Sequence, residues 1–277
     1  MSDIFNFFSQ FQFMQYALLA GFLSGIATGI TGTFVVVKKV SYLGGGIAHA
    51  VMGGLGIAYF LGINPMYGAL AFAIFAAVLI SVVKMRFRQN EDTVISALWS
   101  LGMAIGIIFA YITPGYNVNL LSFLFGNILL VTFENFILLL ILDIIVVSLV
   151  FIFYRQLVFI CFDEEYSRIR GLRVDLLYFI LISMIALTVV VLVQTVGVIL
   201  VIALITLPSA IAAIFTKRIK KMMLLSILLN YIFIFSGIIT AFFIDLPAGA
   251  TIILITGAGY LLAFLIKNFS GKISSAG

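Results

Sequence analysis

The residues that could bind a metal ion or transfer a proton are few in this chain of 277 residues. His49 is the only histidine, and Cys161 is the only cysteine. A neutral imidazole is a good ligand for borderline divalent metals, so His49 is a candidate metal ligand. The alternative role for this side chain is a hydrogen bond to a neighbouring helix. Met52 follows one helical turn later and could add a soft thioether contact, although packing is the commoner role of a methionine.

Acidic side chains are the next candidates for contact with a cation. Asp143 interrupts an apolar stretch. It should face protein or water, since a charged group in lipid is costly. Asn230 is a possible hydrogen-bond partner for it at similar depth. Glu134 and Asp245 are expected at the outer ends of helices, where they could simply be solvated or could attract a cation to the mouth of a pathway.

Motifs for hydrolysis or nucleotide binding are missing from the sequence. There is no GxxxxGK[ST] loop, no HExxH pair, no CxxC pair and no GxSxG elbow. A zinc site of the usual three or four ligands would need carboxylates beside the one histidine. We therefore expect no enzymatic activity and no permanently bound cofactor. Energy for active transport would have to come from an ion gradient or from a separate ATPase.

Long apolar stretches must position these few polar residues. The mean hydropathy is +1.32, and only 9% of the residues are charged. A hydrocarbon core needs roughly 20 apolar residues of helix to cross it. The sequence thus predicts an all-α polytopic membrane protein. Charges and turn residues divide it into nine membrane-spanning helices, at 16–37, 45–62, 67–84, 94–113, 135–154, 176–196, 197–216, 222–244 and 249–267.

Composition divides the chain into three regions. Residues 1–15 form an N-terminal segment that could lie in the membrane interface. Residues 16–267 form a single transmembrane domain. Residues 268–277 are small and polar, so we expect a disordered tail, part of which could be a remnant of cloning.

The fifteen Lys and Arg residues set the expected orientation. Basic residues concentrate on the cytoplasmic side of membrane proteins. All fifteen can lie there if 118–131 does not cross and if 176–216 forms a hairpin that turns near Val196-Gly197. Segment 118–131 is too short to span the bilayer, so we expect it to be re-entrant; a short helix lying on the outer surface is the alternative. The N-terminus would then be outside and the C-terminus in the cytoplasm.

Two local patterns suggest how helices pack and where a partner docks. Gly46, Ala50 and Gly54 repeat at four-residue spacing around His49, a pattern that lets helix backbones approach closely. Pro208 is expected to break the seventh span near its inner end and to start a short interfacial helix. Such a helix could dock a soluble subunit.

Four stretches of the chain resemble the membrane permease subunits of bacterial ABC importers for zinc, manganese and iron ions. The matching stretches are VKKVSYLG with the following IAHA (37–50), LSFLFG (121–126), GVILVIALITLPSA (197–210) and DLPAG (245–249). They occur in the family's order between about residues 15 and 267. The combination is specific, although each piece alone is weak.

The resemblance implies a permease subunit that moves a divalent metal ion inward by ATP-driven alternating access. The implied partners are a second copy of the chain, two cytoplasmic ATP-binding subunits, an extracytoplasmic metal-binding receptor and the lipid of the bacterial cytoplasmic membrane, with no nucleic acid. His49 would contact the ion in transit. The residues that couple to the ATPase would be Pro208, Ser209, Thr216, Lys217 and Arg218.

Three positions depart from the family's pattern. Gly45 stands where many members have an aspartate, four residues before the histidine. Asn127 follows the LFG stretch, where an acid is often found, and remains a candidate at the pathway mouth. Ala213 stands where an arginine is usual. These departures bear on which metal is carried more than on the class of transporter.

Two other classes of protein are weighed against this one. A secondary transporter or channel for cations, working without an ATPase, would need a coupling-ion site and often shows inverted repeats. No clear internal duplication is visible in the sequence. An intramembrane enzyme would need a nucleophile and base or a metal cluster at membrane depth, and one histidine with one deep aspartate offers little support for it.

Overall fold

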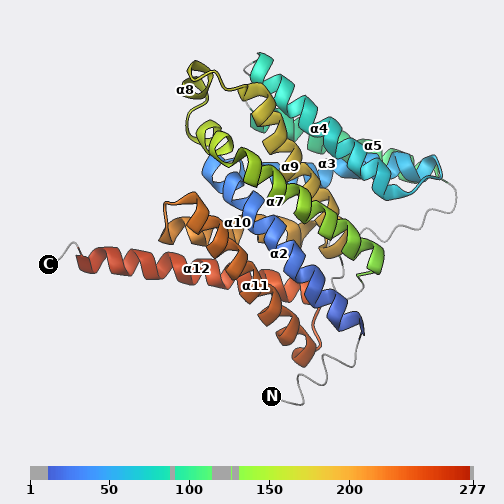
Figure 1. Cartoon of the computed structure of the whole chain (residues 1–277). Coiled ribbons are helices and arrows are strands. Elements are labelled where there is room, and N and C mark those ends of the chain that lie inside the picture. Colours follow the sequence, from blue (N-terminus) through green and yellow to red (C-terminus); the bar gives the residue numbers. More distant parts are fainter. Residues whose placement is uncertain (1–11, 88–90, 114–125, 127–130, 275–277) are drawn as a thin grey trace.

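The protein is a bundle of long helices (Figure 1). The computed structural model describes residues 12–87, 91–113, 126 and 131–274, and no strand occurs among them. Nine helices in this part are long and apolar enough to cross a membrane, as the sequence predicts. They are α2 (Gln12–Lys38), α3 (Ser41–Phe60), α4 (Pro65–Phe87), α5 (Glu91–Ile112), α7 (Phe133–Phe162), α9 (Val174–Val196), α10 (Val198–Phe215), α11 (Ile219–Ile244) and α12 (Ala248–Ser274). A short helix, α8 (Glu164–Ile169), joins α7 to α9.

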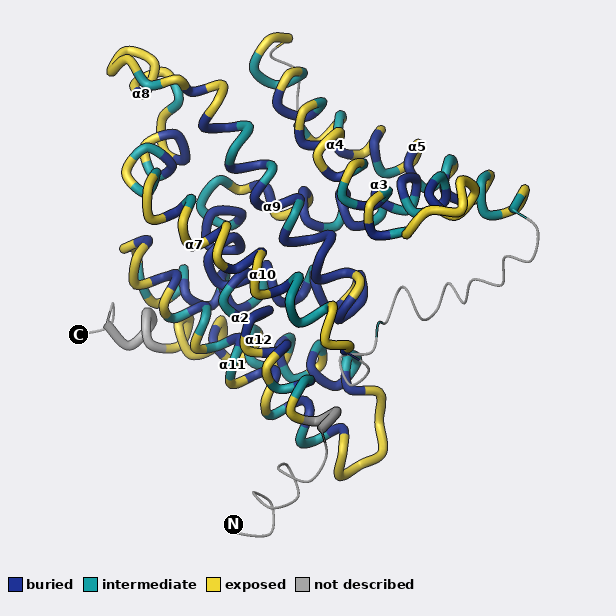
Figure 2. Tube along the Cα trace, turned by 45° about the vertical axis from the view of Figure 1, so that its right-hand side comes forward, coloured by how far each residue is buried: buried dark blue, intermediate teal, exposed yellow. Residues whose placement is uncertain are grey.

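Helices α2, α9 and α10 form the centre of the bundle. α2 packs against α7, α10 and α11, and α9 packs against α4 and α7. In Figure 2 the tube through α9 and α10 is mostly dark blue, whereas the outer helices carry long yellow runs. Exposed apolar side chains such as Phe151 and Leu254 suit contact with lipid, because the bilayer interior is as apolar as they are.

Helices α3, α4 and α5 form a tightly packed group held by small residues. A Cβ atom on Gly53 or Gly56 of α3 would come within 2.9 Å of the backbone of Gly102 or Gly106 of α5. Gly54 lies equally close to α4. Close backbone approach of this kind needs residues without side chains. The small-residue face predicted around His49 is therefore confirmed as a packing surface.

A cluster of ion pairs ties the ends of five helices together. Lys38 of α2 pairs with Glu164 of α8, and Lys84 of α4 pairs with Glu91 of α5. Lys84 also lies 3.2 Å from Glu164. The Tyr178 hydroxyl of α9 donates to Glu91 at 2.5 Å. This basic end of the bundle joins α4 and α5 to the central helices α2 and α9.

Three turns at the opposite end contain a residue with left-handed backbone. α9 and α10 form the expected hairpin, and Gly197 between them has φ +88°. Gly62, two residues after the end of α3, has φ +68°, and Asp245, directly after α11, has φ +57°. Glycine adopts such angles without a Cβ clash, and aspartate tolerates them better than most residues.

The segment between α5 and α7 begins and ends on one side of the bundle. α5 starts at the ion-pair cluster and α7 ends beside it, so the segment leaves α5 and enters α7 at the opposite end. Most of 118–131 falls outside the described residues, so its re-entrant path stays a prediction. Gly126, with φ +58°, is described, and it lies directly against the Val196-Gly197 turn.

Two local expectations from the sequence are wrong. Pro208 does not break its helix, because α10 runs unbroken from Val198 to Phe215 with Pro208 buried inside it. Packing in the core outweighs the lost backbone hydrogen bond there. α12 continues to Ser274, so residues 268–274 are helical where the sequence suggested a disordered tail. No proline or charge run ends the helix earlier, which is the physical reason for the difference.

Candidate functional site

The imidazole of His49 is held in a defined orientation on α3. Its Nδ1 lies 2.8 Å from the carbonyl oxygen of Gly45, one turn earlier. Since a carbonyl only accepts, Nδ1 carries the hydrogen, and in the neutral ring Nε2 keeps a lone pair for a ligand. The ring also stacks on Trp99 of α5, with centroids 4.4 Å apart. A backbone acceptor on one nitrogen is the arrangement that orients a metal-binding histidine.

Two methionines lie on the helices that carry His49 and Trp99. Met52 lies one turn further along α3 and is partly buried. On α5 the Trp99 indole donates to Met103 Sδ at 3.1 Å. Sequence reasoning missed Trp99 and Met103. A signal was available for Trp99, which is the only tryptophan of the chain.

One copy of the chain offers an ion few ligands at this place. No group of three or more His, Cys, Asp or Glu side chains that could hold a metal occurs in the described part of the chain. A lone imidazole with thioethers nearby binds a divalent ion weakly. Weak binding suits a transit site, since a conducted ion must also leave it.

A face of α3 and α5 beside His49 exposes polar side chains. Tyr42 and Ser96 bond to each other at 3.2 Å, and Ser96 and Ser100 are exposed. Tyr42 is the second residue of α3 and Ser96 the sixth of α5, so the face begins near the ion-pair end of the bundle. Its polar groups need protein or water as partners, because lipid cannot hydrogen-bond them. This polar face could therefore line a pathway or meet another subunit.

Asp143 lies apart from His49, on α7 against α2. The side chain is only 5% exposed, and neither carboxylate oxygen has a hydrogen-bond partner among the described residues. Asn230 does not bond to it. Its Nδ2 donates to Thr28 Oγ1 at 3.0 Å instead, so the suggested pairing is not formed. The structure thus brings Asp143 into the helix core and not to the polar face of α3 and α5.

The predicted mouth residues lie at the end of the bundle away from the ion-pair cluster. Glu134 is exposed in the first turn of α7. Asp245 is exposed at the end of α11. Asn127 lies outside the described residues. Neither exposed acid contacts His49, which leaves both solvation and attraction of a cation open as roles.

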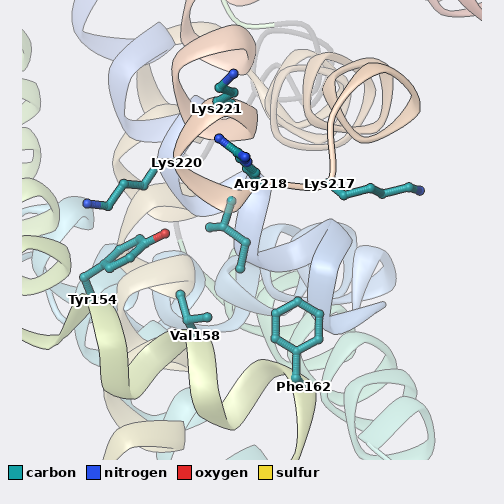
Figure 3. Close-up of a pocket in the computed structure, with 8 residues that line it drawn as sticks. Tyr154, Val158, Phe162, Lys217, Arg218, Lys220 and Lys221 are labelled. Carbon is teal, nitrogen blue, oxygen red and sulfur yellow. The ribbon is translucent and has the colours of Figure 1, made fainter.

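The predicted coupling residues divide into two sets. Pro208 and Ser209 are buried inside α10, and Ser209 lies beside Gly32 of α2, so they are core residues. Thr216 is partly buried in the link between α10 and α11, and Lys217 and Arg218 are exposed there. Only the link can touch another protein directly. Figure 3 shows it at the edge of a cleft against α7.

Comparison with known proteins extends over almost the whole chain. A model described as the ABC 3 transport family matches residues 10–267. The chain is 39% identical over 256 residues to a probable metal transport system membrane protein of Chlamydia pneumoniae, covering 90% of this chain and 87% of that relative. It is 31% identical over 277 residues to the manganese transport system membrane protein MntC of Halalkalibacterium halodurans, covering 99% and 95%.

A solved structure agrees with the fold. PsaBC from Streptococcus pneumoniae in complex with Fab contains a chain that superposes with a TM-score of 0.82 at 28% identity, over 95% of each chain. The arrangement of nine long helices is thus shared with that protein. This protein therefore belongs to the ABC 3 transport family and is a multi-pass protein of the bacterial cytoplasmic membrane.

Proposed function

We propose that this chain is the permease subunit of an ATP-driven importer for divalent transition-metal ions, namely zinc, manganese or iron. The observation that carries the proposal is the fixed imidazole of His49, with Nε2 free for a ligand, in a chain whose relatives include a manganese transport system membrane protein. His49 would be a ligand of the ion in transit. Met52 would line the path beside it.

A second copy of the chain would complete the pathway. The described part of one copy supplies too few ligands at His49, and its α3 and α5 expose tyrosine and serine side chains beside it. Two copies facing each other there would cover these groups and bring two imidazoles towards one path. Two-fold symmetry is the commonest arrangement of soluble homo-oligomers. The two copies would alternate between outward-open and inward-open states.

The energy would come from two cytoplasmic ATP-binding subunits. Thr216, Lys217 and Arg218 form a link that would contact them, and the buried Pro208 and Ser209 would pass the movement to α2 through the close packing of α10. This assignment requires the basic end of the bundle to face the cytoplasm, as the positive-inside rule indicates. The N-terminus would then be outside and the C-terminus inside.

The opposite end would receive ions from a metal-binding receptor. Glu134 and Asp245 are exposed there, and acids near a narrow opening raise the local concentration of cations. Asn127 would lie at the same mouth, in the segment predicted to be re-entrant. Asp143 is buried against α2, and any contact with the ion would need the helices around it to move apart.

Reconstitution into lipid vesicles tests the proposal. The chain is purified with and without its ATP-binding subunits, and entry of radioactive zinc, manganese or iron is followed with the receptor present. We expect uptake only when the ATP-binding subunits and hydrolysable ATP are both present. Rapid uptake by this chain alone would favour the alternative, a channel or secondary transporter for cations, and would contradict the proposal.

A further inference from the structure

A cleft opens between α7 and α11 at the basic end of the bundle. Both helices pack along α2, but they make almost no contact with each other in the described part of the chain. The space left between them is about 480 Å³. Because α2 holds the two walls apart, the cleft is a property of the fold and not of one side-chain rotamer.

The walls of the cleft combine apolar surface with positive charge. Its α7 wall consists of Tyr154, Val158 and Phe162, which share one face of that helix at four-residue spacing. The other wall is the stretch 217–221, which contains four basic residues around a buried isoleucine. In Figure 3 the four basic side chains extend in different directions from the stretch 217–221. The result is an apolar base with a cationic rim.

No carboxylate in the described part of the chain neutralises the positive charge of this rim. Lys38, Lys84 and Arg168 pair with carboxylates, whereas none of the four basic residues of 217–221 has an acidic partner among the described residues. Lys220 instead lies over the ring of Tyr154, with Nζ 5.0 Å from its centroid. Four cations within five residues attract an anion with several acceptor oxygens, such as a phosphate.

The apolar surface beyond the cleft indicates which phosphate compound fits. Below Tyr154, the same face of α7 continues with Phe151, which is 87% exposed, and then Val147. Below Lys220, the face of α11 continues with Leu224 and Leu228, which are 69% and 56% exposed. Both walls thus extend into apolar stripes that run towards the membrane interior. A soluble anion would make no contact with these apolar stripes, whereas the acyl chains of a lipid would lie along them.

We propose that the cleft between α7 and α11 binds an anionic phospholipid, with Lys220 and Lys221 at its phosphate and its acyl chains along the exposed faces of the two helices. Lys217 extends to the side away from Tyr154 in Figure 3, so it remains available to the ATP-binding subunit. The lipid would occupy the groove beside the link between α10 and α11. This site is separate from the polar face at His49.

Native mass spectrometry of the purified full chain tests the site, with phosphatidylglycerol and phosphatidylcholine of the same acyl chains added in equal amounts. We expect the wild-type chain to retain phosphatidylglycerol preferentially. Lys220→Gln with Lys221→Gln should lower this preference about fivefold for each charge removed. Val158→Trp fills the cleft without changing the charge, and this variant should also lose the preference for phosphatidylglycerol.

Arg86→Gln is the matched control, because Arg86 is an exposed basic residue at the same end of the bundle. It should keep the wild-type preference, and all variants should unfold at the wild-type temperature in phosphatidylcholine. Equal loss in the Arg86 control, or no preference in the wild type, would overturn the proposal. Displacement by glycerol 3-phosphate at lipid concentrations would assign the rim to a soluble anion. If the double lysine variant kept its lipid but no longer bound the ATP-binding subunit, the rim would be a docking surface for that subunit, and the proposal would be overturned.

Discussion

At the scale of single residues, the orientation of His49 determines what its side chain can do. The Gly45 carbonyl fixes the hydrogen on Nδ1, and Trp99 fixes the plane of the ring. The free nitrogen can therefore meet an ion without first breaking a hydrogen bond within the described part of the chain. The residue type was visible in the sequence. The stacking partner was not, because it comes from a helix fifty residues away along the chain.

Glu164 is the residue on which the ion-pair cluster depends, since both Lys38 and Lys84 approach its Oε1. Burial raises the pKa of Glu164, but the two lysines outweigh this effect and leave the pKa below its ordinary value of 4.5. A carboxyl with a lowered pKa stabilises the fold above its ordinary pKa and loses that contribution as the pH falls through the folded value. Acid should therefore loosen this end of the bundle below about pH 4.5.

Replacement of Glu164 by Gln tests this account. We expect the free energy of unfolding to fall by about 2 kcal/mol. This is less than the roughly 3–5 kcal/mol expected on breaking a fully buried ion pair, because the carboxylate is partly exposed. Thermal unfolding of the wild type and the variant in detergent, at pH 7 and at pH 4, measures this change in stability. Glu165→Gln, an exposed neighbour with the same change of charge, should have little effect. Equal losses in the two variants would show that the cluster adds no stability.

Neither carboxylate oxygen of Asp143 accepts a well-formed hydrogen bond among the described residues, so its carboxyl should be a cost to folding. An acid at the centre of a membrane helix costs roughly 2.5–3.5 kcal/mol on insertion scales. We therefore expect Asp143→Asn to unfold at a higher temperature than the wild type. Metal uptake by the same variant separates the two roles. Unchanged uptake would leave Asp143 outside the pathway, and a strong decrease would place it there.

At the scale of elements, the glycines of α3 and α5 determine how closely these helices pack. The sequence predicts the small-residue face of α3, because its spacing repeats along one side of the helix. It does not show that α5 supplies the matching glycines, since pairing between helices depends on the whole bundle. The unbroken α10 is a similar case, because core packing around Pro208 cannot be read from propensity.

Substitution of Gly102 by Ala tests the close packing. A Cβ at this position would meet the backbone of Ala50, which cannot move aside alone. We expect overpacking to lower the free energy of unfolding by about 1–3 kcal/mol. Gly257→Ala in α12 is the control, because nothing lies within 4 Å of its Cβ position. It should be neutral or slightly stabilising, and equal unfolding temperatures for the two variants would contradict the packing account.

At the scale of the whole molecule, charge pattern and helix length predict most of the fold. The nine spans and the hairpin at Val196-Gly197 follow from where apolar runs and turn residues stand. The candidate site is only partly predictable, because under the proposed function one copy would contain only part of it. His49 can be recognised as a candidate from its residue type, but ligands from a second copy would follow from assembly and not from spacing along the chain.

Cysteine labelling tests the orientation of the molecule. Single cysteines replace Arg86, Lys220 and Tyr67 in a chain whose own Cys161 is buried. A membrane-impermeant thiol reagent added to intact cells should leave the first two unlabelled and label the third, because Tyr67 lies at the start of α4 and is 67% exposed. Labelling of Arg86 and Lys220 from opposite sides would be incompatible with the bundle.

The central claim is that the transported metal ion touches His49 on its way through the protein. The most direct measurement is metal uptake and ATP hydrolysis by the reconstituted complex with His49→Ala, compared with the wild type and with Met52→Leu. We expect uptake to fall at least about tenfold, a typical loss for damage to a metal site, while ATP hydrolysis and assembly persist. Wild-type uptake by a stably assembled His49→Ala complex would contradict the account.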